Sequence, residues 1–240
     1  MHSLALSRSL DLAGVRNLRD IGGYPTRDGR QTRWRTLYRA DSPHRLTEAG
    51  RRSLVALGVR TLIDLRRPSE IALAPYAFDS DGLVRRAIPL LDDGPARSLR
   101  SLDEVYRTIL VEGQARLATV LRTLIDSLPA VVHCTAGKDR TGIVIALVLS
   151  LAGVPDEIVA HDYALTRACQ TDSYWDEARQ RAAAAGIAWE DYQQLLICPP
   201  ELMLATLRFL RHEFGGAERY ARSAGLSGRE IDRLRQAIVE

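Results

Sequence analysis

One segment constrains the fold of this 240-residue chain more than any other: residues 130–153, AVVHCTAGKDRTGIVIALVLSLAG. It begins with a short apolar run, AVVHC, passes through a polar loop, and is then apolar at nearly every position up to Gly153. The first run has the length and composition of a buried strand. The last is a helix, from about Thr141, without a polar face, so it must also be buried. A buried strand leading directly into a buried helix is typical of layered α/β folds.

The preceding residues show the alternation of strands and helices that this expectation requires. Runs rich in β-branched and apolar residues predict strands at 36–40, 59–65 and 83–91, and residues 46–58 have the spacing of an amphipathic helix. A longer helical region follows at about 102–128. The sequence therefore predicts an α/β fold with a mostly parallel β-sheet flanked by helices.

The last third of the chain shows helical patterns only. Pro155 is typical of a first helical turn, and Ser227 and Glu230 have the spacing of a capping box. No repeat, low-complexity tract or linker separates this part from the rest. We therefore expect a single domain over 1–240, in which residues from about 155 to 240 form an all-helical cap.

Composition narrows the class of protein. Hydrophobic residues make up 46% of the chain and charged residues 26%, and the net charge of +3 is too small to indicate a nucleic-acid partner. The three cysteines lack the spacing of a metal site or a disulfide framework, so we expect no metal, no cofactor and a cytoplasmic location. No apolar run has the length of a bilayer span, so we expect no integral membrane segment. The sequence does not indicate the oligomeric state.

The loop between the buried strand and helix contains Cys134 and Arg140 with five residues between them. Loop N–H groups and the start of the following helix would face one concavity, where they can bind the oxygens of a phosphate. Such surroundings favour the nucleophilic thiolate of a cysteine, and an arginine at the rim can bind two phosphoryl oxygens in the transition state. The residues expected to hold the phosphate are Thr135, Ala136, Gly137, Lys138 and Thr141.

These roles together describe a cysteine-dependent phosphatase. Cys134 would attack phosphorus to form a phosphocysteine, Thr141 would hydrogen-bond the thiolate as it leaves, and water would hydrolyse the intermediate. A buried cysteine with no chemical role is the simpler interpretation of Cys134 alone, but the other residues of the loop favour the catalytic one. Cys169 and Cys198 lack such surroundings, so we expect packing or surface thiols there.

The segment HCTAGKDRTG resembles the signature loop of the protein tyrosine phosphatase superfamily. NLRDIGGY, LYRAD, IDLRRPSE and EFGGAERYARSAGLS are similar to segments of its bacterial tyrosine/lipid phosphatase family, which has a GKDRT loop and includes the mycobacterial PtpB-like enzymes. The resemblance extends from about residue 14 to the end. It implies a phosphatase-type sheet and a helical cap that can act as a lid. It also implies phosphorylated protein or phosphoinositide substrates, with phosphoserine and phosphothreonine beside phosphotyrosine.

Several polar residues outside the loop are candidates for supporting roles. The resemblance implies a hydrogen-bonded brace behind the loop, formed by Asn17, Arg19 and Asp20. Asp64 and Arg66 lie at the end of a predicted central strand, where α/β folds collect ligands, and are either part of the chemistry or a buried ion pair. His133 either polarises the surroundings of the cysteine or is a core histidine with satisfied hydrogen bonds.

The first chemical step expels an alkoxide or phenoxide, so a protonated carboxyl group should stand near the leaving oxygen. The best-placed candidate is Asp92, which resembles the acid position of the mycobacterial enzymes. Asp93 is adjacent, and an ordinary turn is the alternative for both because DDGP has strong turn composition. Asp139, inside the loop, is the rival candidate.

Lys138 is the only lysine among 33 lysine and arginine residues, and it lies two positions before Arg140. A compact cation beside a planar guanidinium suits a substrate with more than one phosphate. A lysine at this position resembles enzymes that act on phosphoinositides as well as phosphotyrosine. The alternative is an exposed loop lysine without substrate contact.

Two other functions compete with an active phosphatase. A catalytically inactive phospho-binding module would keep the anion site without turnover, but the intact cysteine, arginine and threonine of the loop argue against it. Arsenate or sulfur redox chemistry would favour a resolving cysteine, and Cys169 and Cys198 are far from Cys134 in sequence. The sequence therefore predicts a protein-tyrosine-phosphatase, a phosphoric monoester hydrolase whose substrates extend to phosphoinositides.

Overall fold

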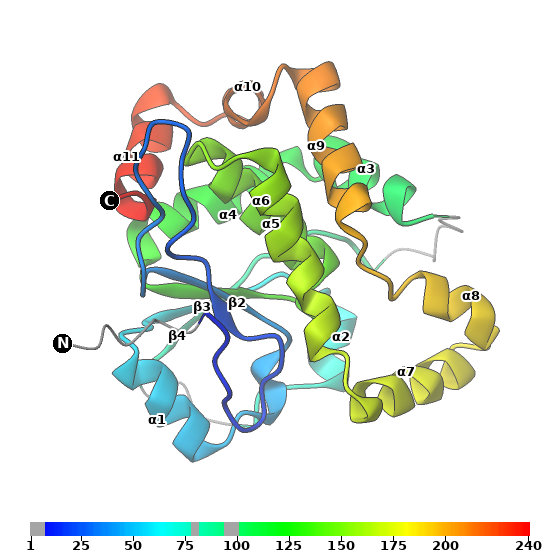
Figure 1. Ribbon diagram of the computed structural model, residues 1–240. Helices are drawn as coiled ribbons and strands as arrows, with labels where there is room; N and C mark the ends of the chain where they lie inside the picture. The colour runs from blue at the N-terminus through cyan, green and yellow to red at the C-terminus, as the bar shows by residue number, and fades with distance from the viewer. Residues whose placement is uncertain (1–7, 78–81, 94–100) are drawn as a thin grey trace.

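The computed structural model describes residues 8–77, 82–93 and 101–240 (Figure 1). Within them, a five-stranded sheet has the order β1-β2-β5-β3-β4. The strands are β1 (Arg19–Asp20), β2 (Leu37–Ala40), β3 (Thr61–Asp64), β4 (Val84–Ala87) and β5 (Ala130–His133). Only the β1–β2 pair of this sheet is antiparallel. The predicted α/β class with a mostly parallel sheet is confirmed.

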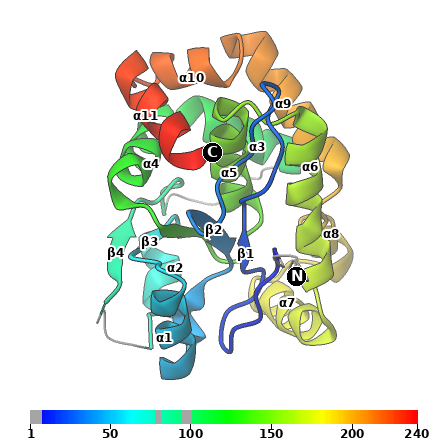
Figure 2. The same cartoon turned by 60° about the vertical axis from the view of Figure 1, so that its left-hand side comes forward.

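Helices cover both faces of the sheet (Figures 1 and 2). The α-helices of the first part are α1 (Glu48–Ala56), α2 (Pro68–Leu73), α3 (Leu102–Glu112), α4 (Gln114–Ser127) and α5 (Asp139–Leu151). Those of the last part are α6 (Asp156–Ala164), α7 (Asp172–Ala184), α8 (Trp189–Gln194), α9 (Pro200–Phe214), α10 (Ala217–Ser223) and α11 (Gly228–Ile238). Short 3-10 helices, η1 (Pro43–Arg45) and η2 (Leu165–Cys169), precede α1 and α7. Helices α4, α5 and α11 lie on one face of the sheet, and α1 lies on the other.

Local sequence signals account for several element boundaries. The Thr47 side chain accepts a hydrogen bond from the N–H of Gly50 at the start of α1, and Ser227 and Glu230 form the predicted capping box of α11. The strand predicted at 83–91 is shorter, although the N–H groups of Ile88 and Leu90 still donate to the carbonyls of Asp64 and Leu65 beyond its end. Part of the predicted DDGP turn lies outside the described residues.

Helix α5 is the centre of the larger hydrophobic core. Apart from Asp139 and Ser150, each of its residues is buried, which confirms the prediction of a helix without a polar face. It begins two residues earlier than predicted, so Asp139 lies in its first turn. No helix in the described part of the chain is long and apolar enough to span a membrane.

The register of the sheet brings three strand ends together. Ala40 and Asp64 pair with His133 from opposite sides, so β2, β5 and β3 end at the same level. The segments that follow these strands therefore leave one edge of the sheet side by side, where α/β folds bind their ligands. The loop from Cys134 to Lys138 is the central one of the three.

Candidate active site

The loop after β5 wraps around the beginning of α5. Cys134 is 2% exposed and Arg140 is 9% exposed, so both side chains lie inside the fold. Gly137 has a φ of +65°, and a Cβ atom there would lie 2.3 Å from the carbonyl oxygen of Ala40. Only glycine fits this approach to β2. The turn directs the chain into a 13-residue helix whose first N–H groups have no partner within the helix.

The carbonyl groups of this loop are held on its outer side. The Ser42 N–H donates to the Thr135 carbonyl (3.2 Å), and the side-chain amide of Asn17 donates to the carbonyls of Ala136 and Gly137 (3.2 and 3.1 Å). Arg39 also donates to the Gly137 carbonyl (2.7 Å), and the Gly142 N–H donates to the Lys138 carbonyl (2.7 Å). In a trans peptide the N–H points opposite to the C=O. The N–H groups that follow these four carbonyls therefore face the inside of the loop, as an anion site requires.

A buried network behind the loop orients these donors. The Asp162 carboxylate of α6 accepts hydrogen bonds from Arg19 (3.1 Å), Arg39 (2.6 Å) and the Tyr24 hydroxyl (2.9 Å). Burial opposes its negative charge, but the two guanidinium groups outweigh burial and hold the pKa of Asp162 well below its usual range. Arg19 also donates to the side-chain oxygen of Asn17, which turns the Asn17 amide toward the loop.

The residues that brace the loop therefore differ from the predicted set. Asn17 and Arg19 belong to it, whereas the carboxylate of Asp20 accepts the N–H groups of Gly22 and Arg35 and orders the turn after β1. Arg39 and Asp162 were missed by the sequence analysis, although Arg39 lies within the LYRAD segment. No local pattern marks Asp162, because its partners are more than a hundred residues away.

Glu70 of α2 binds the guanidinium of Arg140. Its two carboxylate oxygens accept hydrogen bonds from the two Nη atoms at 2.5 and 2.8 Å, and one of them also accepts the Thr135 hydroxyl at 2.6 Å. Burial disfavours the Glu70 carboxylate, but Arg140 and Thr135 more than compensate and lower its pKa to about 2. Glu70 lies in the IDLRRPSE segment but was not among the predicted site residues.

Lys138 does not reach the substrate side of the loop. Its side chain is 2% exposed, and its Nζ donates to the Asp139 carboxylate (2.7 Å) and to the Ile197 carbonyl (3.1 Å). The prediction of a mobile cation for a second phosphate is wrong, and so is the alternative of an exposed loop lysine. The helical cap supplies the carbonyl that buries this ammonium group.

Asp139 is held at one of its two oxygens. Lys138 and the hydroxyl of Tyr106, a residue of α3, both donate to Oδ1 at 2.7 Å. The Tyr106 hydroxyl also lies 2.7 Å from that of Tyr163 on α6. The side chain of Asp139 is 27% exposed, so the carboxyl group is fixed on one side and open on the other.

The structure does not bring Asp92 or Asp93 to the loop. The Asp92 carboxylate is 77% exposed and pairs with Arg116 of α4 at 2.5 Å. The Asp93 carboxylate accepts the N–H of Ser69 at 2.9 Å, together with its hydroxyl. Both side chains thus bind residues of other helices, Asp92 on α4 and Asp93 on α2, and the predicted turn lies partly outside the described residues.

Asp64 and Arg66 form a buried ion pair at 2.7 Å, each at most 2% exposed, which settles the two interpretations of these residues in favour of structure. His133 is fully buried, and its Nε2 lies 2.7 Å from the Tyr76 hydroxyl. Burial lowers the pKa of His133 to about 4, although Asp64 opposes this, so the ring is neutral near pH 7. His133 is thus a core histidine with hydrogen-bond partners.

The structure also shows the surroundings of Thr141 and of the other two cysteines. The Thr141 hydroxyl is buried and has no hydrogen-bond partner among the described residues, so the predicted bond to Cys134 is not formed in this conformation. Cys198 is buried, whereas Cys169 is half-buried and faces a pocket beside the loop. The described residues contain no His, Cys, Asp and Glu cluster suited to a metal ion.

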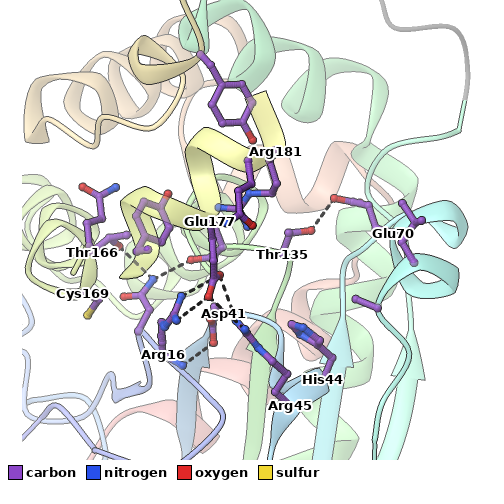
Figure 3. A pocket seen from close by; sticks show the side chains of 18 of the residues that line it. Arg16, Asp41, His44, Arg45, Glu70, Thr135, Thr166, Cys169, Glu177 and Arg181 are labelled. Carbon is purple, nitrogen blue, oxygen red and sulfur yellow. Dashed lines mark hydrogen bonds and ion pairs between the residues drawn. The ribbon is translucent and has the colours of Figure 1, made fainter. Parts of the chain in front are cut away.

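The pocket beside the loop has a volume of about 670 Å³ (Figure 3). Thr135 and Ala136 of the loop line one part of it, and α7 lines another. Glu177 of α7 accepts hydrogen bonds from Arg16 (2.9 Å) and from Arg45 (3.2 Å), which ties α7 to the N-terminal segment and to η1. The entrance to the loop is thus bordered by charged side chains from three parts of the chain.

Comparisons with known proteins show the family of this chain. A sequence model of the tyrosine phosphatase family matches residues 10–240. The chain is 33% identical over 205 residues to a tyrosine-protein phosphatase of Nostoc commune, which covers 80% of this chain and 70% of that protein. It is 25% identical over 277 residues to the triple specificity protein phosphatase PtpB of Mycobacterium tuberculosis, with coverage of 95% and 98%. The crystal structure of P. aeruginosa TpbA aligns with 85% of this chain and 98% of its own, at 21% identity and a TM-score of 0.40. The chain belongs to the tyrosine phosphatase family.

Proposed function

We propose that this protein hydrolyses phosphotyrosine through a covalent phosphocysteine formed on Cys134. The observation that carries the proposal is the outward fixing of the loop carbonyls by Asn17, Arg39, Ser42 and Gly142. It leaves a ring of inward N–H groups around a buried cysteine, which is an anion site organised before the substrate arrives. Such an arrangement stabilises the charge of a phosphoryl group without reorganisation during the reaction.

In the first step, the thiolate of Cys134 attacks phosphorus in line with the bond to the tyrosyl oxygen. Arg140 binds two equatorial oxygens in exchange for its contacts with the Leu65 carbonyl and the Thr135 hydroxyl, while Glu70 keeps its guanidinium in one orientation. The P–O bond breaks, and Asp139 gives its proton to the leaving phenoxide. In the second step, Asp139 accepts a proton from water, the resulting hydroxide attacks phosphorus, and the cysteine thiolate departs.

Asp139 is a better acid candidate in this reaction than Asp92. Both donors on Asp139 bind Oδ1, so Oδ2 is left for the proton that the leaving group takes. Asp92 is directed at Arg116, and movement to the loop would require this ion pair to break. The assignment also explains the burial of Lys138, which positions Asp139.

Phosphotyrosine is the favoured substrate because the Nostoc commune relative, which covers 80% of this chain, is named a tyrosine-protein phosphatase. The triple specificity in the name of the mycobacterial relative extends the proposal to phosphoserine and phosphothreonine. We propose phosphoinositides only as minor substrates. Lys138, the cation expected to bind their additional phosphate, is buried and paired with Asp139. A reducing, cytoplasmic environment would protect Cys134 from oxidation, as the mechanism requires.

The experiment is hydrolysis of p-nitrophenyl phosphate and of a phosphotyrosyl peptide with EDTA present. We expect turnover by the wild type, none above background by Cys134→Ser, and turnover by the matched control Cys198→Ala. Binding of the phosphopeptide by the wild type without turnover would instead indicate a phospho-binding module. Turnover that persists in Cys134→Ser would exclude the cysteine mechanism.

A further inference from the structure

Arg181 of α7 is a cation in the substrate pocket that pairs with no carboxylate of the described residues. Its Nε is buried and has no hydrogen-bond partner among the described residues, and its guanidinium carbon lies 5.8 Å from the centroid of the Tyr174 ring. Arg181 lines the same pocket as Thr135 and Ala136 of the phosphate loop. In Figure 3 it extends from α7 beside Glu177, with no interaction drawn to it.

The other arginines around this pocket are compensated. Arg16 and Arg45 share the Glu177 carboxylate, and Arg140 is bound by Glu70. The remaining carboxylate in the middle of α7, Asp176, pairs with Arg179 on the exposed side of the helix. Arg181 is therefore available to an anionic group that enters with the substrate.

We infer that Arg181 binds the carboxylate of an acidic residue next to the phosphotyrosine of a peptide substrate. The inference rests on the proposed function, which places the scissile phosphate in the loop at the other part of the pocket. A guanidinium binds a carboxylate with two parallel hydrogen bonds and adds specificity as well as affinity. The second anion site that the sequence suggested at Lys138 thus lies at Arg181.

The lining of the pocket favours a peptide as the carrier of this carboxylate. Leu73, Ala74, Ala184 and Tyr192 line it together with Arg181, and these side chains suit a tyrosyl ring and the side chains that flank it. At about 670 Å³ the pocket is also larger than one phosphotyrosyl side chain requires.

The test compares two phosphotyrosyl peptides of equal length, one with Asp and Glu beside the phosphotyrosine and one with alanine at both places. For the wild type we expect a KM lower by about three- to tenfold for the acidic peptide, the range of the net contribution of one hydrogen bond between partly exposed groups. In Arg181→Gln the ratio of the two KM values should approach one. Arg179→Gln is the matched control, since it removes a positive charge from the same helix but outside the pocket, and it should keep the wild-type ratio.

Binding of the same peptides to Cys134→Ser, with and without Arg181→Gln, is measured by fluorescence anisotropy. This arm separates the inference from the mechanism, because a preference for the acidic peptide that depends on Arg181 supports the inference even if turnover is absent. A preference that survives Arg181→Gln contradicts it. A short-chain phosphoinositide that binds better than the acidic peptide, and loses this advantage in Arg181→Gln, would show that Arg181 serves a second phosphate instead.

Discussion

The carboxylate of Glu70 accepts hydrogen bonds from both Nη atoms of Arg140, at 2.5 and 2.8 Å. The two residues lie 70 positions apart in the chain, on α2 and α5, and both side chains are largely buried. A guanidinium group bound at both Nη atoms has one orientation, whereas an unpaired arginine side chain samples many. This contact explains how an arginine on a helix can be ready for a phosphoryl group before the substrate binds.

Replacement of Glu70 by glutamine tests this positioning role. Glu70→Gln keeps the size of the side chain but removes the charge, so Arg140 should lose its fixed orientation and kcat/KM for a phosphotyrosyl peptide should fall by roughly ten- to a hundredfold. Glu48→Gln is the control, because Glu48 forms an exposed ion pair with Arg51 on α1. Equal activity of the two variants would show that Glu70 does not position Arg140.

The acid assignment is tested by comparing Asp139→Asn with Asp92→Asn. Loss of the general acid should lower kcat for a phenyl phosphate by about a hundredfold or more. The effect should be smaller for p-nitrophenyl phosphate, whose leaving group needs less protonation. If Asp92→Asn shows this pattern and Asp139→Asn does not, the turn that holds Asp92 must rearrange during catalysis.

The brace behind the loop is tested at Asn17. This residue has a φ of +57°, so Asn17→Gly removes the amide without adding backbone strain. We expect kcat/KM to fall by about tenfold or more, because the Ala136 and Gly137 carbonyls lose a donor that fixes the loop, at a cost of roughly 1–3 kcal/mol in stability. Arg35→Gly is the matched control, with a φ of +56° at an exposed site. Loss of stability alone, with full activity per folded molecule, would reduce Asn17 to a purely structural role.

The raised pKa of Asp41 predicts that the stability of the folded chain depends on pH. Burial raises its pKa to about 7 from an ordinary value near 3.8, although the N–H of Arg16 and nearby arginines oppose the shift. The folded chain therefore binds this proton more tightly than the unfolded chain, so the carboxyl group makes folding less favourable as the pH rises from 3.8 through 7. Asp41→Asn should raise the unfolding temperature relative to the wild type more at pH 8 than at pH 5. Asp126→Asn, at an exposed ion pair with Arg233, should shift it equally at both pH values, and the same behaviour of Asp41→Asn would contradict the shifted pKa.

Local patterns were sufficient for the longer elements of this fold. The apolar run of β5, the apolar helix α5 and the caps at Thr47 and Ser227 depend on neighbouring residues, so the sequence predicts them directly. The short antiparallel strand β1 and the six-residue helix α2 were missed, because neither is long enough to show a period. Cys134 and Arg140 were predicted as site residues because their spacing within one loop is a local property of the sequence.

The partners of the loop could not be predicted in this way. Arg39 and Asp162 are 123 positions apart, and neither periodicity nor composition tells which buried arginine meets which carboxylate. Lys138 illustrates the same limit: its position in the loop indicated a cation for the substrate, but the Ile197 carbonyl, 59 positions later, turns it inward. Tertiary hydrogen bonds thus decide which charges of the site remain free.

The central claim, a covalent phosphocysteine on Cys134, is tested most directly by acid quenching during turnover, followed by mass spectrometry of the peptide that contains this residue. The account predicts a phosphoryl group on Cys134 in the wild type, in amounts that rise when Asp139→Asn slows hydrolysis of the intermediate. It predicts none on Cys169 or Cys198. Turnover without any phosphorylated Cys134, in both the wild type and Asp139→Asn, would contradict the account.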